Sequence, residues 1–271
     1  FRRRGGTGPH DGSPYDAFLR KNGLPVEPDP LETPLEYGRR LRALVATLAS
    51  PRFVDVQDGR LELHTHGFRF GPDALAGLRV FLAEPAGLPA TPAELAAGGI
   101  GNCLACHRPP RFTDGSFHNV GRTERAYDLV HGAGAFAALS VPSLAVRNAA
   151  FETYLPGTEA HPDGDGPFLD IEDPTRPGRT DLGLWNVFAN PDVPGPQARL
   201  RTLLLNQLGL PPPTTDDDLL PRTIAWFKTP ALRDLGQSPP FFHDGSADDL
   251  EACVRHYVGV SDRQRAGVVR N

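Results

Sequence analysis

The amino-acid sequence predicts a mainly α-helical, loop-rich protein that contains one small β-hairpin. Two observations predict this class. Four segments carry apolar residues at helical spacing. The 271 residues also include 29 glycines and 29 prolines, and 39% are hydrophobic, which indicates long irregular connections between helices. This length allows one large core or two smaller ones.

The first three helices are expected at Pro34 to Ser50, from Pro72 onward, and at Leu200 to Leu208. Proline can open a helix, as Pro72 does, and it also ends helices, because it has no N–H to donate. Pro51 therefore limits the first helix, and a run of three prolines limits the third. The apolar stripes of the first two are Leu41, Leu44, Val45, Leu48 and Leu75, Leu78, Phe81, Leu82.

A fourth helix is expected over Ser246 to Val258. Ser246 can cap it, and acidic residues occupy its first turn, where the helix dipole favours them. Its apolar residues at i, i+3, i+4 and i+7 are Leu250, Cys253, Val254 and Tyr257. We expect these four to form one buried stripe, with His256 rotated about 100° away from Tyr257.

The hairpin is expected around Asp58-Gly59, the preferred two-residue turn, with strands over 53–57 and 60–66. On such a strand His64 and His66 share a face that would suit a metal, although two solvated histidines are the simpler interpretation. Residues 1–33 and 108–199 show little periodicity, so no regular element is predicted there.

Charge and hydropathy exclude several classes of partner. Lys and Arg number 28 against 33 Asp and Glu, for a net charge of −5. This near balance gives no reason to expect nucleic acid or an anionic membrane as a partner. No apolar run approaches the length of a membrane span.

The most specific motif is Cys103-Leu104-Ala105-Cys106-His107, the attachment signature of c-type haem. Each thiol can add to a haem vinyl group, and the histidine becomes the proximal iron ligand. A zinc site would need a second pair of ligands, and the remaining cysteine, Cys253, is alone and far away. One covalent haem c is therefore predicted. Because haem c is attached outside the bacterial cytoplasm, the protein is expected to be periplasmic or otherwise exported.

The chain contains no methionine. Methionine is a common sixth ligand of electron-transfer haem c. The sixth ligand of this haem, if it has one, must therefore be another residue type.

Three later segments resemble bacterial dihaem cytochrome c peroxidases and MauG-like proteins. They are 112–121 (FTDGSFHNVG), 227–234 (FKTPALRD) and 237–245 (QSPPFFHDG), followed by an element that starts at Leu250-Glu251. The resemblance covers the second haem domain of that family. It implies a cytochrome c-like helical domain over residues 71–271, with a long insert at about 122–222. Residues 1–70 are interpreted as an N-terminal extension, a remnant of the first haem domain.

The resemblance also implies the iron ligands. With Pro240 aligned to the family's corresponding proline, Tyr257 falls at the distal position, which is tyrosine in MauG and methionine in the peroxidases. His107 and Tyr257 are then the two axial ligands. Alternatively, Tyr257 is a core aromatic residue, and the iron is five-coordinate or bound by histidine.

Other residues of these segments have weaker assignments. Trp226, like Trp185, would relay electrons or holes, or would simply pack in a core. His118 and His243 would contact haem propionates or brace the Tyr257 pocket, or serve only structure. Arg233 would pair with a propionate. The family's calcium ion would take backbone carbonyls at Ser238 and Pro240. Asp163 and Asp165 have calcium-loop spacing, but the rest of such a loop is missing.

The chain departs from the family in two ways. It carries a single CxxCH motif, and the insert makes the segment between its first two family motifs longer. A redox protein is therefore expected, which transfers electrons or holes with a partner protein or a second haem-bearing chain. Two alternatives stay open: an autonomous peroxidase that reduces hydrogen peroxide at an open haem, or a haem-stapled structural subunit. The redox and structural classes predict a six-coordinate, low-spin ferric haem, and the autonomous peroxidase predicts a high-spin one.

Overall fold

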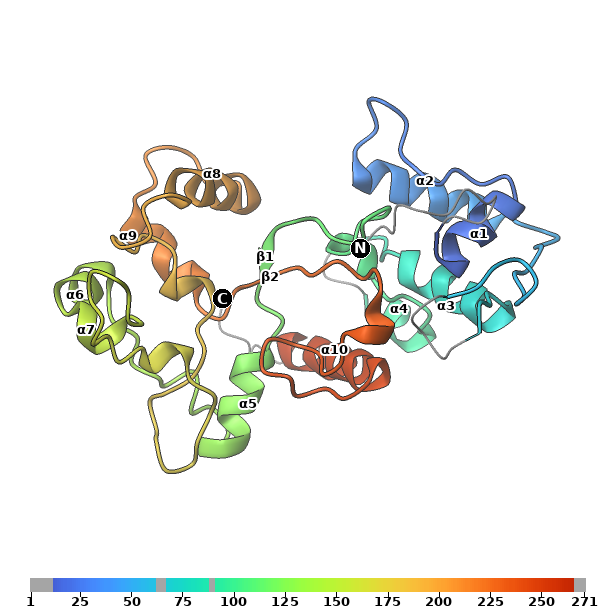
Figure 1. The fold of residues 1–271 in the computed structure, drawn as a ribbon. Helices are drawn as coiled ribbons and strands as arrows, with labels where there is room; N and C mark the ends of the chain where they lie inside the picture. Colours follow the sequence, from blue (N-terminus) through green and yellow to red (C-terminus); the bar gives the residue numbers. More distant parts are fainter. Residues whose placement is uncertain (1–11, 62–66, 88–90, 266–271) are drawn as a thin grey trace. The chain divides into compact units, whose positions relative to one another are not determined.

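The computed structural model describes residues 12–61, 67–87 and 91–265, and helices form most of its regular structure (Figure 1). The mainly α class is thereby confirmed. The chain divides into two compact units. Unit 1 comprises Phe1–Gly115 and Thr229–Ser238, and unit 2 comprises Ser116–Lys228 and Pro239–Asn271. No helix in the described ranges is both long and apolar enough to cross a membrane.

Unit 1 is built from short helices that begin at proline. They are α1 (Pro14–Lys21), α2 (Pro34–Ala46), α3 (Pro72–Leu82), α4 (Pro92–Ala97) and the 3₁₀ turns η1 (Cys103–Ala105) and η5 (Leu235–Gln237). A reciprocal capping box opens α1, α2 and α4, in which a Ser or Thr side chain and an acidic side chain three residues later bond each other's backbone N–H groups. The helices predicted at Pro34 and Pro72 are thus confirmed.

Helices α1, α2 and α3 share one hydrophobic core with Leu104 of the CxxCH motif, and Figure 1 shows these helices together. We call this cluster core 1. Its buried members are Ala17, Phe18, Leu19, Tyr37, Leu41, Val45, Val54, Phe68, Phe70, Leu75, Leu78, Leu82 and Leu104. Residues from both sides of position 70 therefore pack in one unit. The predicted domains, 1–70 and 71–271, stay a prediction.

The predicted hairpin at Asp58-Gly59 is wrong. Asp58 instead closes a turn with Asp55, since its N–H donates to Asp55 O (2.8 Å) and its carboxylate accepts from the Asp55 N–H (2.8 Å). Val54 then pairs with Phe70 in an isolated antiparallel bridge. Within the described residues 53–61 the chain therefore forms this turn and not two paired strands. Residues 62–66, including His64 and His66, lie outside the described residues.

Unit 2 contains the described two-stranded sheet, in which β1 (Phe117–His118) and β2 (Phe227–Lys228) pair antiparallel with Phe117 opposite Lys228. Its helices are α5 (Arg122–His131), α6 (Leu144–Ala149), α7 (Phe151–Tyr154), α8 (Gln197–Leu208), α9 (Asp216–Leu219) and α10 (Leu250–Arg265), and its 3₁₀ turns are η2 (Pro167–Leu169), η3 (Leu184–Asn186) and η4 (Leu220–Thr223). Helix α8 confirms the prediction at Leu200 to Leu208.

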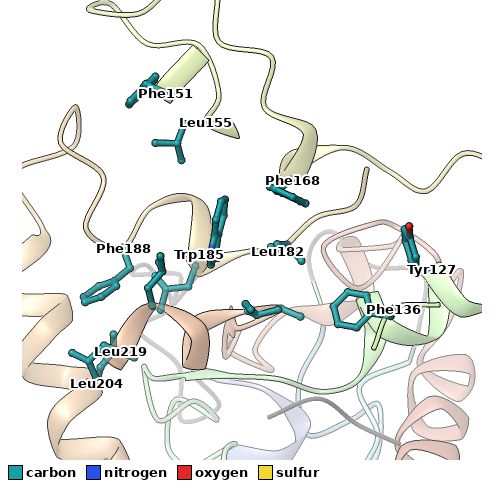
Figure 2. Close-up of a cluster of buried hydrophobic side chains, with 14 residues drawn as sticks. Tyr127, Phe136, Phe151, Leu155, Phe168, Leu182, Trp185, Phe188, Leu204 and Leu219 are labelled. Atoms are coloured by element: carbon teal, nitrogen blue, oxygen red, sulfur yellow. The ribbon is translucent and has the colours of Figure 1, made fainter. Parts of the chain in front are cut away.

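The segment predicted as an insert supplies most of the core of unit 2. We call this cluster core 2, and Figure 2 shows Trp185 near its centre, with Phe188 to one side and Leu182 to the other. Its buried members are Tyr127, Phe136, Phe151, Leu155, Phe168, Leu182, Leu184, Trp185, Phe188, Leu204, Leu219, Leu220, Ile224 and Ala225. The insert is therefore a folded part of the unit and not a loose loop.

Replacing Gly38 with alanine is expected to destabilise unit 1. A Cβ atom at Gly38 on α2 would clash with Cδ1 of Leu104, which is fully buried in core 1. We expect a cost of about 1–3 kcal/mol, typical of overpacking, in urea unfolding. Gly77→Ala on α3 is the matched control, because nothing lies within 4 Å of its added Cβ. There we expect a gain of about 0.5–1 kcal/mol. Equal effects of the two changes would contradict the close packing of α2 on the CxxCH turn.

Candidate haem-attachment site

The CxxCH motif folds as a tight turn in unit 1. Asn102 enters it in the left-handed conformation (φ +50°), residues Cys103–Ala105 form η1, and the His107 N–H donates to Cys103 O (2.8 Å). Leu104 is fully buried in core 1, whereas both cysteines stay partly exposed and neither forms a disulfide. The buried leucine anchors the turn, so that two reduced thiols and one imidazole are presented beside each other.

The imidazole of His107 is held through one of its two nitrogens. Its Nδ1 lies 3.0 Å from Phe112 O. A carbonyl oxygen only accepts, so Nδ1 carries the proton and Nε2 is the nitrogen whose lone pair can bind a metal. Proximal histidines are oriented in this way by a hydrogen bond at the other ring nitrogen.

The thiols and the imidazole fit haem c in chemistry. Burial raises the pKa of the Cys103 thiol, so this sulfur is a neutral thiol at neutral pH rather than a thiolate. A structural zinc site would need a fourth ligand beside these two thiols and one imidazole. The third cysteine, Cys253, lies on α10 in the other unit. The donors near one another along the chain are those that haem attachment requires.

Arg233, which was predicted to pair with a propionate, has protein partners in this structure. Its Nε and Nη2 donate to Pro110 O (2.8 and 2.6 Å), and its Nη1 donates to Asp16 Oδ2 (2.7 Å). Asp16 belongs to the capping box of α1. The arginine therefore ties the loop after the CxxCH motif to the first helix of the chain.

The remaining predicted residues of the site belong to unit 2. His118 lies on β1, and the Trp226 side chain is half-buried next to β2. The His243 ring stacks on Phe227, with centroids 3.6 Å apart, and its Nε2 lies 3.4 Å from the Thr123 hydroxyl. Partial desolvation of the ring lowers the pKa of His243, so the neutral form is favoured.

Trp226 borders a shallow apolar pocket in unit 2. The pocket has a volume of about 300 Å³, and its lining includes Phe117, Leu184, Phe227 and Lys228. The backbone of Trp226 also joins η3 to β2, because its carbonyl accepts from the Leu184 N–H (2.9 Å). Trp185, the other tryptophan, is fully buried in core 2.

The buried face of α10 differs from the prediction. Leu250, Val254 and Tyr257 are 47, 63 and 42% exposed, whereas His256 is 3% exposed and Val260 5%. The predicted stripe is therefore wrong. His256 Nε2 donates to Val120 O (2.9 Å), so a polar side chain takes the inward position.

The start of α10 also differs from the prediction. The helix begins at Leu250, and the Asp249 carboxylate accepts from the Ala252 N–H (2.7 Å), so Asp249 replaces Ser246 as its cap. Ser246 instead donates to the Asp244 carboxylate, its neighbour two residues back (2.7 Å). The predicted helix existed, but its first turn came later in the chain.

The predicted calcium ligands do not gather in one unit. Ser238 belongs to unit 1 and Pro240 to unit 2. The Ser238 N–H donates to Leu235 O (3.1 Å). In the other acidic segment, Asp165 pairs with Arg179 (2.6 Å), which occupies the carboxylate that a calcium loop would use. The calcium assignment stays a prediction.

Two features of the site had no counterpart in the sequence analysis. One is the carbonyl of Phe112, which is a backbone atom and leaves no side-chain pattern. The other is Asp16, which contacts Arg233 across more than two hundred residues. The Ser13-Pro14-Tyr15-Asp16 run could have indicated the start of α1, because it has capping-box spacing with proline at the first helical position.

No protein-family model, no curated protein and no solved structure matches this chain.

Proposed function

We propose that this protein is a periplasmic c-type haem redox protein of the dihaem cytochrome c peroxidase and MauG family. One observation supports this most: the CxxCH motif folds as a 3₁₀ turn whose histidine has Nδ1 bonded to a backbone carbonyl. In this tautomer Nε2, the nitrogen that a proximal ligand uses, is unprotonated and can bind iron. The three sequence segments that resemble the family point to the same assignment.

Within this proposal, Cys103 and Cys106 hold the haem through thioether bonds, and His107 is its proximal ligand. Bound haem supplies one-electron chemistry at its iron. The Phe112 carbonyl orients the His107 ring and strengthens it as a donor. Tyr257 is the distal ligand, on the strength of the family alignment alone, since the buried stripe that also favoured it is wrong.

The partner is a second haem-bearing chain or a redox protein. A single CxxCH provides one redox centre, whereas the family that the chain resembles uses two haems. Electrons or holes would then enter or leave through another protein. Trp226 is the candidate relay residue of this proposal, since its side chain is partly exposed.

The test of this function is the haem content of the chain. Expressed with a periplasmic haem-attachment system, the protein should carry one haem that resists acid–acetone extraction. Changing both Cys103 and Cys106 to serine should abolish covalent haem, as measured by mass spectrometry and pyridine haemochrome spectra. Cys253→Ser is the control and should keep a full haem load. Wild-type protein without covalent haem under these conditions would refute the proposed function.

A further inference from the structure

The guanidinium of Arg233 lies against two aromatic rings of unit 1, which are also in contact with each other. Its central carbon is 5.0 Å from the Phe112 ring centroid and 5.5 Å from that of Tyr15. The Tyr15 and Phe112 rings meet edge to face, with their centroids 5.2 Å apart. A planar, delocalised cation suits such a place, because it can stack on rings while its edge donates hydrogen bonds.

That edge holds the loop which follows the CxxCH motif. Both Nε and Nη2 donate to Pro110 O, two residues before Phe112. The chain segment that carries Arg233 is bonded to the same loop, through Leu232 N–H to Phe112 O (3.4 Å) and Thr113 Oγ1 to Thr229 O (2.8 Å). The loop is thus tied on both sides of Phe112.

Phe112 needs this support because its backbone is strained. Its φ is +57°, in the left-handed region that residues other than glycine rarely adopt. Such a conformation is unfavourable and persists only where surrounding contacts impose it. In this conformation the Phe112 carbonyl faces Nδ1 of His107 at 3.0 Å.

Asp16 fixes the arginine from the other side. Its Oδ2 accepts from Arg233 Nη1 and also from the Ser13 N–H (2.9 Å) and hydroxyl (2.8 Å) of the capping box. Burial opposes ionisation of Asp16, but the hydrogen bonds from Arg233 and Ser13 outweigh it and hold the pKa of this carboxyl below its usual value. The carboxylate is therefore ionised at neutral pH.

We propose that Arg233 and Asp16 are positioning residues for the proximal histidine. They hold Phe112 in its strained conformation, and the Phe112 carbonyl then sets the tautomer and donor strength of His107. This inference rests on the proposed function in one respect, namely that the atom bound by His107 is haem iron. The contacts themselves all lie within unit 1.

The direction of the effect follows from the hydrogen bond. A carbonyl that accepts from Nδ1–H gives the imidazole more imidazolate character and makes it a stronger donor, which stabilises ferric over ferrous iron. Loosening the loop weakens this hydrogen bond. The midpoint potential should then move to more positive values.

Arg233→Lys is the most informative variant, because it keeps the positive charge and removes the planar fork. One ammonium cannot bond Pro110 and Asp16 in the same geometry. We expect a more positive midpoint potential and about tenfold faster solvent exchange of the His107 Nδ1 proton in NMR spectra, the factor for one lost hydrogen bond. Asp16→Asn should act in the same direction and serves if Arg233→Lys does not fold.

Arg40→Lys is the matched control. Arg40 also belongs to unit 1, makes two hydrogen bonds to a carboxylate, that of Glu32, and stacks on Tyr37 (5.6 Å). The Arg40 side chain is 33% exposed and that of Arg233 is 27% exposed. Their carboxylate partners are also alike, since Glu32 is 14% and Asp16 13% exposed. This control should change neither the potential nor the exchange rate.

The outcomes separate this inference from the proposed function. Haem-loaded Arg233→Lys and Asp16→Asn proteins with wild-type potential and wild-type exchange would overturn the inference and leave the function standing. Wild-type protein without haem would refute the function. In that case the ¹⁵N shifts of the His107 ring still test the positioning role: it predicts an Nδ1–H tautomer in wild type and a shift toward Nε2–H in Arg233→Lys.

Discussion

Replacing Arg147 with methionine is expected to destabilise unit 2 by about 3–5 kcal/mol, since three buried carbonyls lose their donor and each such group costs about 1–3 kcal/mol. Arg147 on α6 is fully buried, and its guanidinium donates to the backbone carbonyls of Trp185, Phe188 and Ala189. Methionine matches much of the volume but donates nothing. Three carbonyls would then be left without these donors in a region that excludes water.

The cation at Arg147 has no acidic partner within the described ranges. Burial lowers the pKa of Arg147 to about 10, so the group is still protonated at neutral pH. The carbonyl oxygens and the Trp185 ring, 4.9 Å from the guanidinium carbon, replace water around this charge. Because these carbonyls follow each other closely along the chain, one side chain holds the whole turn from η3 onward.

Urea unfolding followed by tryptophan fluorescence measures this effect. Both tryptophans of the chain, Trp185 and Trp226, belong to unit 2, so the signal reports on that unit. Arg255→Met is the control, because Arg255 also belongs to unit 2 and makes an exposed ion pair with Glu251 on α10. Its midpoint should stay close to that of wild type. A midpoint for Arg147→Met that matches the control would show that the buried network contributes little.

Arg147 illustrates which parts of the fold the sequence could not predict. Helices α2, α3 and α8 were predicted because each has a local signal, an apolar period with proline at its start or just after its end. Core 2 has no such period. Its residues come from short helices and 3₁₀ turns, whose packing is decided by contacts such as those of Arg147, about forty residues apart in the chain.

Helix α10 shows a different limit. Its existence followed from periodicity, but its inward face did not, because counting apolar residues assumes that the core prefers them. His256 is buried since its ring can donate to the Val120 carbonyl, and Val260 packs against the Gly121 turn. The strands β1 and β2 are two residues long, too short for an alternating pattern to be visible.

The candidate site divides in the same way. The cysteines and His107 were predictable, because the chemistry of haem attachment requires them within five residues. The contacts that orient His107 were not predictable from the sequence. The Phe112 carbonyl is a backbone atom, and the link from Arg233 to Asp16 joins residues 217 positions apart. Sequence spacing identifies reacting groups, whereas the contacts that orient them depend on the fold.

Under the proposed function, Tyr257→Phe is expected to change the ferric haem from six-coordinate, low-spin to five-coordinate, high-spin. If Tyr257 is the distal ligand, its phenolate is a hard anionic donor that stabilises ferric iron. Removing the oxygen also raises the midpoint potential. Tyr257 is 42% exposed on α10, so a bound group can approach its ring.

Optical and EPR spectra of the ferric protein, with a redox titration, measure both effects. Tyr154→Phe is the control, because Tyr154 lies on α7 of the same unit and none of the family segments contains it. It should leave the spectrum and the potential unchanged.

A wild-type protein that is already high-spin and reacts rapidly with peroxide by itself would instead indicate an open iron and an autonomous peroxidase. A low-spin spectrum that survives Tyr257→Phe would assign the distal position to another side chain. Because the chain has no methionine, that side chain would be sought among the histidines, and His118 and His243 of unit 2 are the first to replace.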